Sequence, residues 1–542
     1  MMVLRRFAAV LVAGALFVST AAHARAASTE YAVTEKSVAA LATDLASGKV
    51  TSEALVRAYL ARIAAIDDRG PALHSVIALN PRAIDEARAR DAARRAGEAH
   101  GPLFGIPVLV KDNIETADGT ATTAGSLALA DNVTRRDAPL VERLHAAGAI
   151  VIGKTNLSEW ANIRSSRSIS GWSAVGGLVK NPYALDRNAC GSSSGTGAAI
   201  AASLAAVGVG TETDGSVTCP SSTNGLVGLK PTVGLVSRTH VVPISHTQDT
   251  AGPMGRSVAD VAALLTGLAG SDPNDPATAR ADAHVSDYVA AAQNGKLVGK
   301  RLGVLRYAAA GESPQMDALF AASLATLRAQ GATVVELRAF KPDRRIGDAE
   351  NVVLLTELKT DLNAYLAATP KTVRTRTLAA VMAFDRATPR ELGLFGQDEF
   401  EKANATTGYG AATYRRAHAL AKRLAGPGGI DMLLETYKLD ALVAPSYGPG
   451  WRVDVVDGDN SSGAVAELPA VAGYPHLTVP MGYVMSMPVG ISFVGSAWSE
   501  AKLLGIGAAY ERATHARHVP TYAPSVEGTP AIAPLLAPAK PR

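Results

Sequence analysis

The sequence predicts an α/β protein with a single domain, in which a central mixed β-sheet is covered by helices on both faces. Two observations lead to this fold class. Short apolar runs, typical of buried strands, alternate with amphipathic segments at helical spacing. Across the 542 residues, no break in composition, internal repeat or linker separates one part from another. A hydrophobic content of 47% with only 19% charged residues excludes disorder and is sufficient for a large core.

The first 26 residues are expected to be a secretory signal, which leaves residues 27–542 as the folded domain. Arg5 and Arg6 precede an apolar run over residues 7–20, and small residues in the order A-H-A follow it. This run is short for a membrane span, so the mature protein is expected to be exported, periplasmic or secreted, and free of the membrane. Cleavage would remove three arginines and no acids. The formal net charge then falls from +4 to +1. The charge of the chain therefore gives no indication of a nucleic-acid-binding surface.

The N-terminal part predicts helices followed by two buried strands. The run at 105–110 is continuously apolar, as a buried parallel strand requires, and Lys111 follows its carboxyl end. Ligands of α/β sheets gather beyond the carboxyl ends of strands, so Lys111 is a candidate functional residue. The expected elements are helices at 37–47, 51–67, 81–98 (highly charged and solvated) and 137–147, and strands at 105–110 and 149–152.

The C-terminal half continues the alternation of strands and helices. A strand, a helix and a second strand at 301–305, 315–329 and 333–337 predict a βαβ unit. From residue 519 onward the chain is rich in proline and alanine, which predicts a loose tail. The other expected elements are helices at 257–268, 349–366, 410–425 and 502–511, and strands at 441–445, 477–480 and 489–493.

The candidate chemistry gathers in a serine- and glycine-rich segment at 190–232. The segment is expected to hold a loop at 191–197, a helix of small residues at 198–206, a strand at 207–210 and a second tight loop at 211–216. The strand doubling back along the helix would bring together Ser192 and Ser216, one from each loop. Glycines beside both serines permit a close approach of the backbone to a ligand.

Residues 191–195 also match G-x-S-x-G, the nucleophile elbow of the α/β-hydrolases. That motif requires a strand that runs straight into the serine. The preceding residues, 181–189, are polar and include Pro182, which predicts a loop. The elbow is therefore rejected.

The segment resembles the amidase signature family. The resemblance rests on the serine–glycine loop, on T-D-G-S-x-x-x-P at 213–220 and on G-I-P-V-L-V-K-D-N at 105–113. It implies the amidase-signature fold and a catalytic set of Lys111, Ser192 and the nucleophile Ser216. It also implies a cis peptide bond before Ser192.

Three positions depart from the commoner form of the family and indicate its bacterial peptide amidase branch. Glu212 stands for an aspartate, Asp214 for a glycine and Thr218 for an arginine. The peptide amidases share the glutamate and the aspartate. Lys154, in G-K-T-N, is the rival of Lys111 for the role of base, and it ranks second because the family pattern makes G-K-T-N a structural loop.

The implied chemistry is hydrolysis of a carboxamide through an acyl-enzyme on Ser216. Lys111 accepts a proton only when neutral, and burial lowers the pKa of a lysine. Ser192 is both donor and acceptor, so it would relay the proton from Ser216 to Lys111. The side chain of Asp214 is expected to turn away from the developing negative charge. The oxyanion hole would be formed by successive backbone N–H groups, those of Thr213, Asp214, Gly215 and Ser216.

Three classes of function follow from this pattern. The favoured class is a serine hydrolase that deamidates C-terminal peptide amides to the free acid and ammonia. The second is another enzyme of the family that acts on small or fatty-acid amides; the amidotransferase subunit fits less well, because an exported protein would not meet its tRNA-charging partners. The third is a non-enzymatic binding protein on the same scaffold, and the retention of all three catalytic residues argues against it. The expected partner is the amide substrate, and the sequence is compatible with a monomer.

No cofactor or metal is expected from the motifs. The eleven histidines include no H-E-x-x-H, and His515 and His518 have no acidic or cysteine neighbours. The loop with Asp454, Asp457 and Asp459 lacks the twelve-position pattern of an EF-hand and is expected to be solvated.

Two pairs of residues near the candidate loops have more than one interpretation. Cys190 and Cys219 each lie within three residues of a candidate serine, and both a disulfide and two buried thiols are compatible with this spacing. Trp160, Asn162 and Trp172 lie in loops that would line a substrate cleft. For the two tryptophans, packing is the favoured role.

Overall fold

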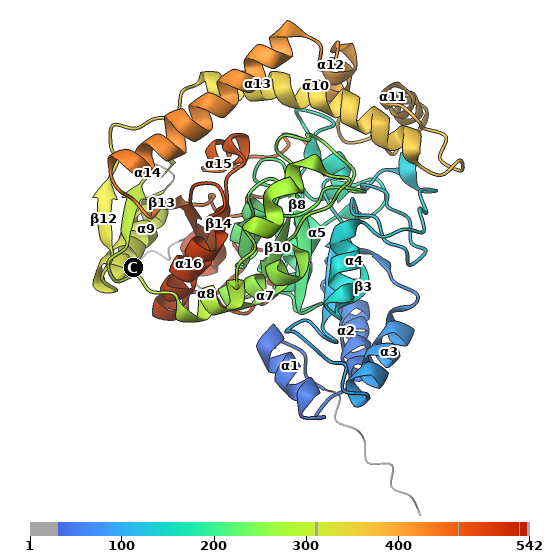
Figure 1. The fold of residues 1–542 in the computed structure, drawn as a ribbon, viewed down its shortest axis with the longest axis horizontal. Helices are drawn as coiled ribbons and strands as arrows, with labels where there is room; N and C mark the ends of the chain where they lie inside the picture. The colour runs from blue at the N-terminus through green and yellow to red at the C-terminus, as the bar shows by residue number, and fades with distance from the viewer. Residues whose placement is uncertain (1–30, 309–312, 464, 531, 539–542) are drawn as a thin grey trace, which may run out of the picture.

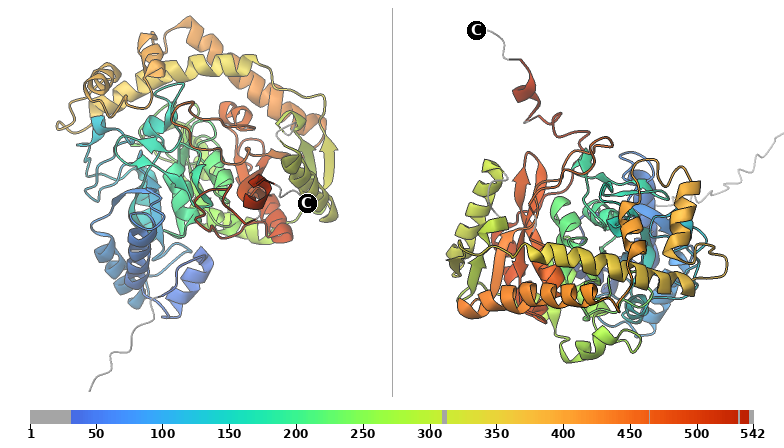
Figure 2. Two further views of the ribbon diagram at one scale, coloured as in Figure 1. Left: turned by 180° about the vertical axis from the view of Figure 1, so that it is seen from behind. Right: turned by 90° about the horizontal axis from the view of Figure 1, so that it is seen from above.

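The computed structural model describes residues 31–308, 313–463, 465–530 and 532–538. The expected secretory signal at 1–26 lies outside these residues. Within the described ranges, no helix combines the length and the apolar character needed to span a membrane. Figures 1 and 2 show one body of helices around a twisted sheet, with the C-terminal stretch projecting from it.

An eleven-stranded mixed sheet forms the centre of the fold, in the order β1-β3-β2-β8-β10-β9-β14-β15-β13-β11-β12. Two small two-stranded sheets, β4–β5 and β6–β7, accompany it. The strands are β1 Val76–Leu79, β2 Pro107–Lys111, β3 Ile150–Thr155, β4 Trp172–Ser173, β5 Gly177–Leu178, β6 Lys180–Asn181, β7 Ala184–Asn188, β8 Val207–Glu212, β9 Val227–Lys230, β10 Thr250–Gly255, β11 Arg301–Val304, β12 Thr333–Glu336, β13 Ala441–Pro445, β14 His476–Val484 and β15 Met487–Val494.

Parallel pairs occupy two places in this sheet. Strand β2 pairs in parallel with β3 and β8, and β11 pairs in parallel with β12 and β13. The other adjacent pairs are antiparallel. The expected mixed sheet and the βαβ unit of β11, α9 and β12 are therefore confirmed. Every residue of β2, β8, β13 and β15 is buried, as expected for strands covered on both faces.

Helices cover the sheet, and two long ones, α10 and α13, lie side by side along one edge of the body in Figure 1. Helices α7 and α16 pack on β10 and β14, whereas α5 packs on β2, β3 and β8. The helices are α1 Val38–Ala46, α2 Ser52–Ile66, α3 Ala83–Arg95, α4 Pro139–Ala146, α5 Ser194–Ala201, α6 Thr218–Thr223, α7 Val258–Leu268, α8 Tyr288–Asn294, α9 Pro314–Ala329, α10 Arg345–Ala368, α11 Leu378–Ala387, α12 Asp398–Ala405, α13 Ala412–Ala425, α14 Met432–Thr436, α15 Glu467–Ala472, α16 Glu500–Thr514 and α17 Ala533–Leu536.

The helix of small residues begins earlier than predicted. It starts at Ser194 and ends at Ala201, so most of the expected loop at 191–197 is helical. A Cβ on Gly195 would clash with the backbone oxygens of Ser75 and Asn156. Close packing of this backbone on its neighbours therefore outweighs the low helix propensity of glycine.

The polar segment before this helix is not a plain loop. It contains the short antiparallel pair β6–β7, which stands apart from the main sheet. The hydroxyl of Ser193, the serine of the G-x-S-x-G match, is fully buried and donates to the backbone oxygen of Thr211. The rejection of a nucleophile elbow is consistent with this arrangement.

Part of the proline- and alanine-rich tail is held against the body, which differs from the expected loose tail. The Tyr522 N–H donates to the Pro182 oxygen at 2.9 Å, and the Leu185 N–H donates to the Ala523 oxygen at 2.8 Å. Val526 is buried in the main core. Farther on, α17 projects into solvent (Figure 2).

Candidate active site

Three backbone segments meet at the carboxyl end of β2. Lys111 is the last residue of β2, and the parallel pairing of Val110 with Val209 brings the end of β8 beside it. The N–H of Ser193 donates to the backbone oxygen of Ser216 at 3.1 Å. The helix and the returning strand therefore bring the two serine loops together, as the sequence predicts.

Lys111 is fully buried and points at the first serine loop. Its Nζ donates to Ser192 Oγ at 2.7 Å and to Thr211 Oγ1 at 2.9 Å. Burial lowers the pKa of Lys111 from 10.5 to about 7, although the carboxylates of Asp249 and Glu212 oppose the shift. Near pH 7 a substantial fraction of this amine is therefore neutral and able to accept a proton.

The peptide bond between Gly191 and Ser192 is cis, as the resemblance implies. The backbone oxygen of Ser192 accepts from the Ser158 N–H at 3.0 Å, so the serine is held by backbone as well as by Lys111. Among the described residues, no hydrogen bond joins the hydroxyls of Ser192 and Ser216. In the described chain, the contact between Lys111 and Ser192 is therefore present and a contact between the hydroxyls of Ser192 and Ser216 is not, and the relay stays a prediction.

Glu212 shapes the loop that carries Ser216. Its Oε2 accepts from the N–H groups of Val217 at 2.7 Å and Thr218 at 2.9 Å, at the start of α6. Within the described chain, the N–H groups before these two, from Thr213 to Ser216, donate to no protein acceptor. No protein acceptor competes for these four N–H groups, and their role as the oxyanion hole stays a prediction.

Gly215 is needed in this loop for two reasons. Its φ of +83° lies in the left-handed region, and a Cβ at this position would clash with the hydroxyl of Tyr447. Asp214, next to it, is exposed, yet desolvation and the carboxylates of Glu350 and Glu212 raise its pKa well above the usual range. Burial also raises the pKa of Glu350 to about 7. The orientation expected for the Asp214 side chain relative to a substrate stays a prediction.

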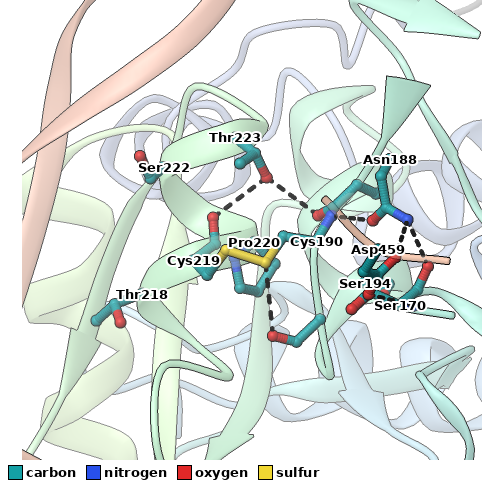
Figure 3. Close-up of a disulfide and its surroundings, with 12 residues drawn as sticks. Ser170, Asn188, Cys190, Ser194, Thr218, Cys219, Pro220, Ser222, Thr223 and Asp459 are labelled. Atoms are coloured by element: carbon teal, nitrogen blue, oxygen red, sulfur yellow. Dashed lines mark hydrogen bonds between the residues drawn. A yellow bond between two sulfur atoms is a disulfide. The ribbon is translucent and has the colours of Figure 1, made fainter. Parts of the chain in front are cut away.

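The two cysteines form a disulfide, which answers the question that their spacing leaves open. Cys190 and Cys219 have Cα atoms 6.0 Å apart, and the bond ties the first serine loop to α6 (Figure 3). The Cys190 N–H donates to Asn188 Oδ1 at 2.7 Å. Asp459, expected in a solvated loop, instead accepts from the Ser170 N–H at 2.9 Å. Asn188 Nδ2 donates to the Ser170 oxygen at 2.8 Å, so these contacts and the disulfide hold the backbone directly before Ser192.

The remaining candidates make packing or polar contacts away from the two candidate serines. Lys154 Nζ pairs with Asp112 Oδ1 at 3.4 Å, and no hydrogen bond in the described chain connects it with the serines. Trp160 and Trp172 are buried against Phe400 and Phe395, with ring centroids 5.8 Å and 5.2 Å apart. The favoured packing role of both tryptophans is therefore confirmed. The Asn162 amide donates to Ser170 Oγ at 3.3 Å.

Sequence reasoning misses two residues that connect the site to a cavity. Thr211 Oγ1 accepts from Lys111 and, at 2.9 Å, from Asn113 Nδ2. The other amide atom, Asn113 Oδ1, is buried without a partner. Both residues, together with Thr213 and Asp249, line a cavity of about 200 Å³. The only signal for Asn113 in the sequence is its place after Lys111 in K-D-N.

The family follows from a comparison with known proteins. A family model described as Amidase matches residues 54–504. The protein belongs to the amidase family. A probable amidase of Arabidopsis thaliana is 39% identical over 517 residues, which cover 93% of this chain and 95% of the relative. The fold matches that of solved members, so this amidase has the expected amidase-signature architecture.

Two solved structures are similar to this amidase along most of its length. A peptide amidase in complex with the competitive inhibitor chymostatin is 49% identical with a TM-score of 0.87, covering 91% of this chain and 100% of the other. The peptide amidase of Stenotrophomonas maltophilia is 49% identical with a TM-score of 0.85, covering 90% and 99%. One of the subunits of the glutamyl-tRNA(Gln) amidotransferase of a Synechococcus species is 34% identical, covering 90% of this chain and 94% of the relative.

Proposed function

We propose that this amidase removes the C-terminal amide of peptides, giving the free acid and ammonia. The observation that carries the chemistry is the 2.7 Å contact of Lys111 Nζ with Ser192 Oγ, at a lysine whose pKa burial lowers to about 7. The substrate class is supported by the 49% identity to a peptide amidase over nine tenths of the chain. The departures at Glu212 and Asp214 agree with it.

In the proposed acylation step, Ser216 Oγ attacks the carboxamide carbon. Its proton passes to Ser192 Oγ, while the Ser192 proton passes to neutral Lys111. A movement must first bring the two hydroxyls into hydrogen-bond contact, because they share no bond in the described chain. Running the relay in reverse protonates the leaving nitrogen, and ammonia departs.

The tetrahedral intermediate would be stabilised by the free N–H groups of Thr213, Asp214, Gly215 and Ser216. Glu212 keeps them in place by binding the next two N–H groups. Losing one such donor costs about 10²- to 10³-fold in kcat in other serine hydrolases. Water then attacks the acyl-enzyme with the same lysine and serine as base and relay.

We also propose that this amidase is exported, to the periplasm or the medium. The N-terminal pattern of two arginines, an apolar run and small residues motivates this, and the disulfide between Cys190 and Cys219 supports it, because such bonds persist in oxidising compartments. A fusion of residues 1–30 to a reporter that is active only outside the cytoplasm tests the proposal. Retention of the reporter in the cytoplasm would contradict it.

Two other functions are outcomes of the test below. The Lys111–Ser192–Ser216 unit would serve equally in hydrolysis of small or fatty-acid amides, since only the pocket differs. The 34% identity to an amidotransferase subunit favours a third reading, in which the released ammonia is passed on and not lost. That reading needs a partner to receive the ammonia, and it conflicts with export.

The experiment compares one peptide in two forms, as its C-terminal amide and extended by one residue, followed by mass spectrometry. A pocket closed beyond the leaving nitrogen accepts the NH₂ group and excludes a following residue by clash. We expect a 1 Da increase in mass for the amide, with ammonia release, and no cleavage of the extended peptide. Equal cleavage of both forms would indicate a protease-like site. Turnover of long-chain fatty amides alone would identify the second class.

A further inference from the structure

A cluster of three potential metal ligands lies outside the catalytic unit. Glu357 and Asp361 occupy positions one helical turn apart on α10, so their carboxylates share one face. His246, from the loop before β10, faces both of them. Its Nδ1 lies 3.0 Å from Asp361 Oδ2 and 3.6 Å from Glu357 Oε2. All three ligand atoms lie within 4.8 Å of one another.

The spacing of these atoms suits a zinc-type ion. Bonds of 2.0–2.2 Å from zinc to imidazole nitrogen and carboxylate oxygen place neighbouring ligand atoms of a tetrahedron about 3.3 Å apart. The two measured distances from His246 lie on either side of this value. The two carboxylate oxygens lie within 4.8 Å of each other, so side-chain shifts would bring all three ligand atoms to the spacing that one ion requires.

Hydroxyl groups already orient the two carboxylates from behind. Tyr414 Oη donates to Glu357 Oε1 at 2.6 Å, and Tyr409 Oη donates to Asp361 Oδ1. Both tyrosines bind the oxygen that is farther from His246, and so they turn the other oxygen towards the imidazole. Tyr409 Oη also lies 3.2 Å from His246 Nδ1, a contact that the ion would replace. Hydrogen bonds of this kind fix ligand orientation at metal sites. The hydroxyls of Ser245 and Thr247 donate to Glu357 Oε2 itself, so an ion bound there would share this oxygen with them.

The negative charge of the cluster and its position on a cavity also suit a bound cation. Glu357 is fully buried, and with Asp361 it brings two negative charges to one point. Of the nearby cations, Arg238 pairs with Asp275, whereas Lys422 donates to the neutral Thr247 oxygen at 3.3 Å and keeps its attraction to Glu357. His246 and Asp361 line the cavity of about 200 Å³ that Asn113 and Thr211 also line, so a fourth position would be open to water or a small ligand.

We propose that His246, Glu357 and Asp361 bind a divalent zinc-type ion with one position open to this cavity. The ion would tie the loop before β10 to α10. It would take no part in the acyl transfer, because none of its ligands contacts Lys111, Ser192 or Ser216 in the described chain. Its effect is therefore on stability, and amide hydrolysis proceeds without it.

Titration calorimetry with zinc chloride on chelator-treated, dialysed full-length amidase tests the site. We expect one zinc ion per chain and a higher melting temperature with zinc. His246→Ala should abolish both effects, and Tyr409→Phe should weaken binding by about 10-fold through the lost orientation of Asp361. His246 is exposed, so its replacement leaves the core unchanged. His100→Ala, at an exposed histidine on another face, is the matched control and should bind zinc like the wild type.

Absence of saturable zinc binding would overturn the proposal. So would unchanged binding in His246→Ala, or an equal loss in His100→Ala, because either result assigns the zinc to unspecific surface histidines. Peptide-amide turnover is measured in parallel on the chelator-treated protein. Its persistence separates this site from the catalytic unit, and its loss with recovery on zinc addition would overturn the non-catalytic role.

Discussion

Lys111 and Ser192 are 81 positions apart in the chain, yet the lysine Nζ lies 2.7 Å from the serine hydroxyl inside the protein. Lys111 is the last residue of strand β2, and Ser192 lies in the segment directly before α5. The pair is buried, and the carboxylates of Asp249 and Glu212 only partly oppose the effect of burial on the pKa of the lysine. A lysine held in this way favours the neutral form that a proton acceptor requires.

Replacing Lys111 by alanine should abolish most of the activity. The relay then has no final acceptor, and general bases typically contribute about 10²- to 10⁴-fold. We expect kcat for a peptide amide to fall by that factor, while circular dichroism and the melting temperature show an intact fold.

The matched control for this variant is Lys154→Met. Lys154 is equally buried and pairs with Asp112, so its loss should lower stability by about 3–5 kcal/mol through an unpaired carboxylate. The kcat of the folded protein should stay near that of the wild type. Activity that survives in Lys111→Ala and disappears in Lys154→Met would show that Lys154, and not Lys111, is the base.

The pH dependence of kcat/KM should report the same lysine. Its pKa is lowered from 10.5 to about 7, so the amine is neutral above about pH 7 and charged below. Activity is therefore present above that pH and should fall about tenfold per unit as the pH drops below it. Burial raises the pKa of Glu350 to about 7 as well, so Glu350→Gln is the control and should keep the acid limb. A flat profile between pH 5 and 8 would contradict the prediction.

Loss of the disulfide should lower stability more than it lowers kcat. The bond closes a loop with a sequence separation of 29, for which chain entropy gives about 3–4 kcal/mol. The Cys190→Ser/Cys219→Ser double variant should therefore melt several degrees below the wild type at the same scan rate. Mild reduction of the wild type should give the same shift. Equal melting temperatures of the oxidised and the double-variant proteins would show that the bond contributes no stability.

The sequence predicts the fold and the candidate residues because their signals are contiguous. The apolar run before Lys111 and the loops around Ser192 and Ser216 are each short, continuous motifs that can be recognised from a few neighbouring residues. Strands β9 and β10 are missed, because their short glycine- and proline-containing segments have no strand periodicity. Their neighbours in the sheet, and not their own sequence, make them strands.

Other features depend on distant partners and cannot be read along the chain. The start of α5 at Ser194 depends on packing against Ser75 and Asn156, and the disulfide depends on where α6 brings Cys219. In the cluster of His246, Glu357 and Asp361, the histidine lies 111 and 115 positions before the two acids, so no local motif marks it. Thr211 contacts Lys111 only because β2 and β8 are neighbours in the sheet.

The most direct test of the account is the identity of the acylated residue. The wild type is incubated with a serine-directed acylating reagent, and the adduct is counted by intact mass and located by peptide sequencing. We predict one adduct per chain, on Ser216, with loss of activity in proportion, and no adduct in Ser216→Ala. Acylation of another residue, an active Ser216→Ala variant, or activity that a chelator abolishes and zinc restores would contradict the Ser216–Ser192–Lys111 mechanism.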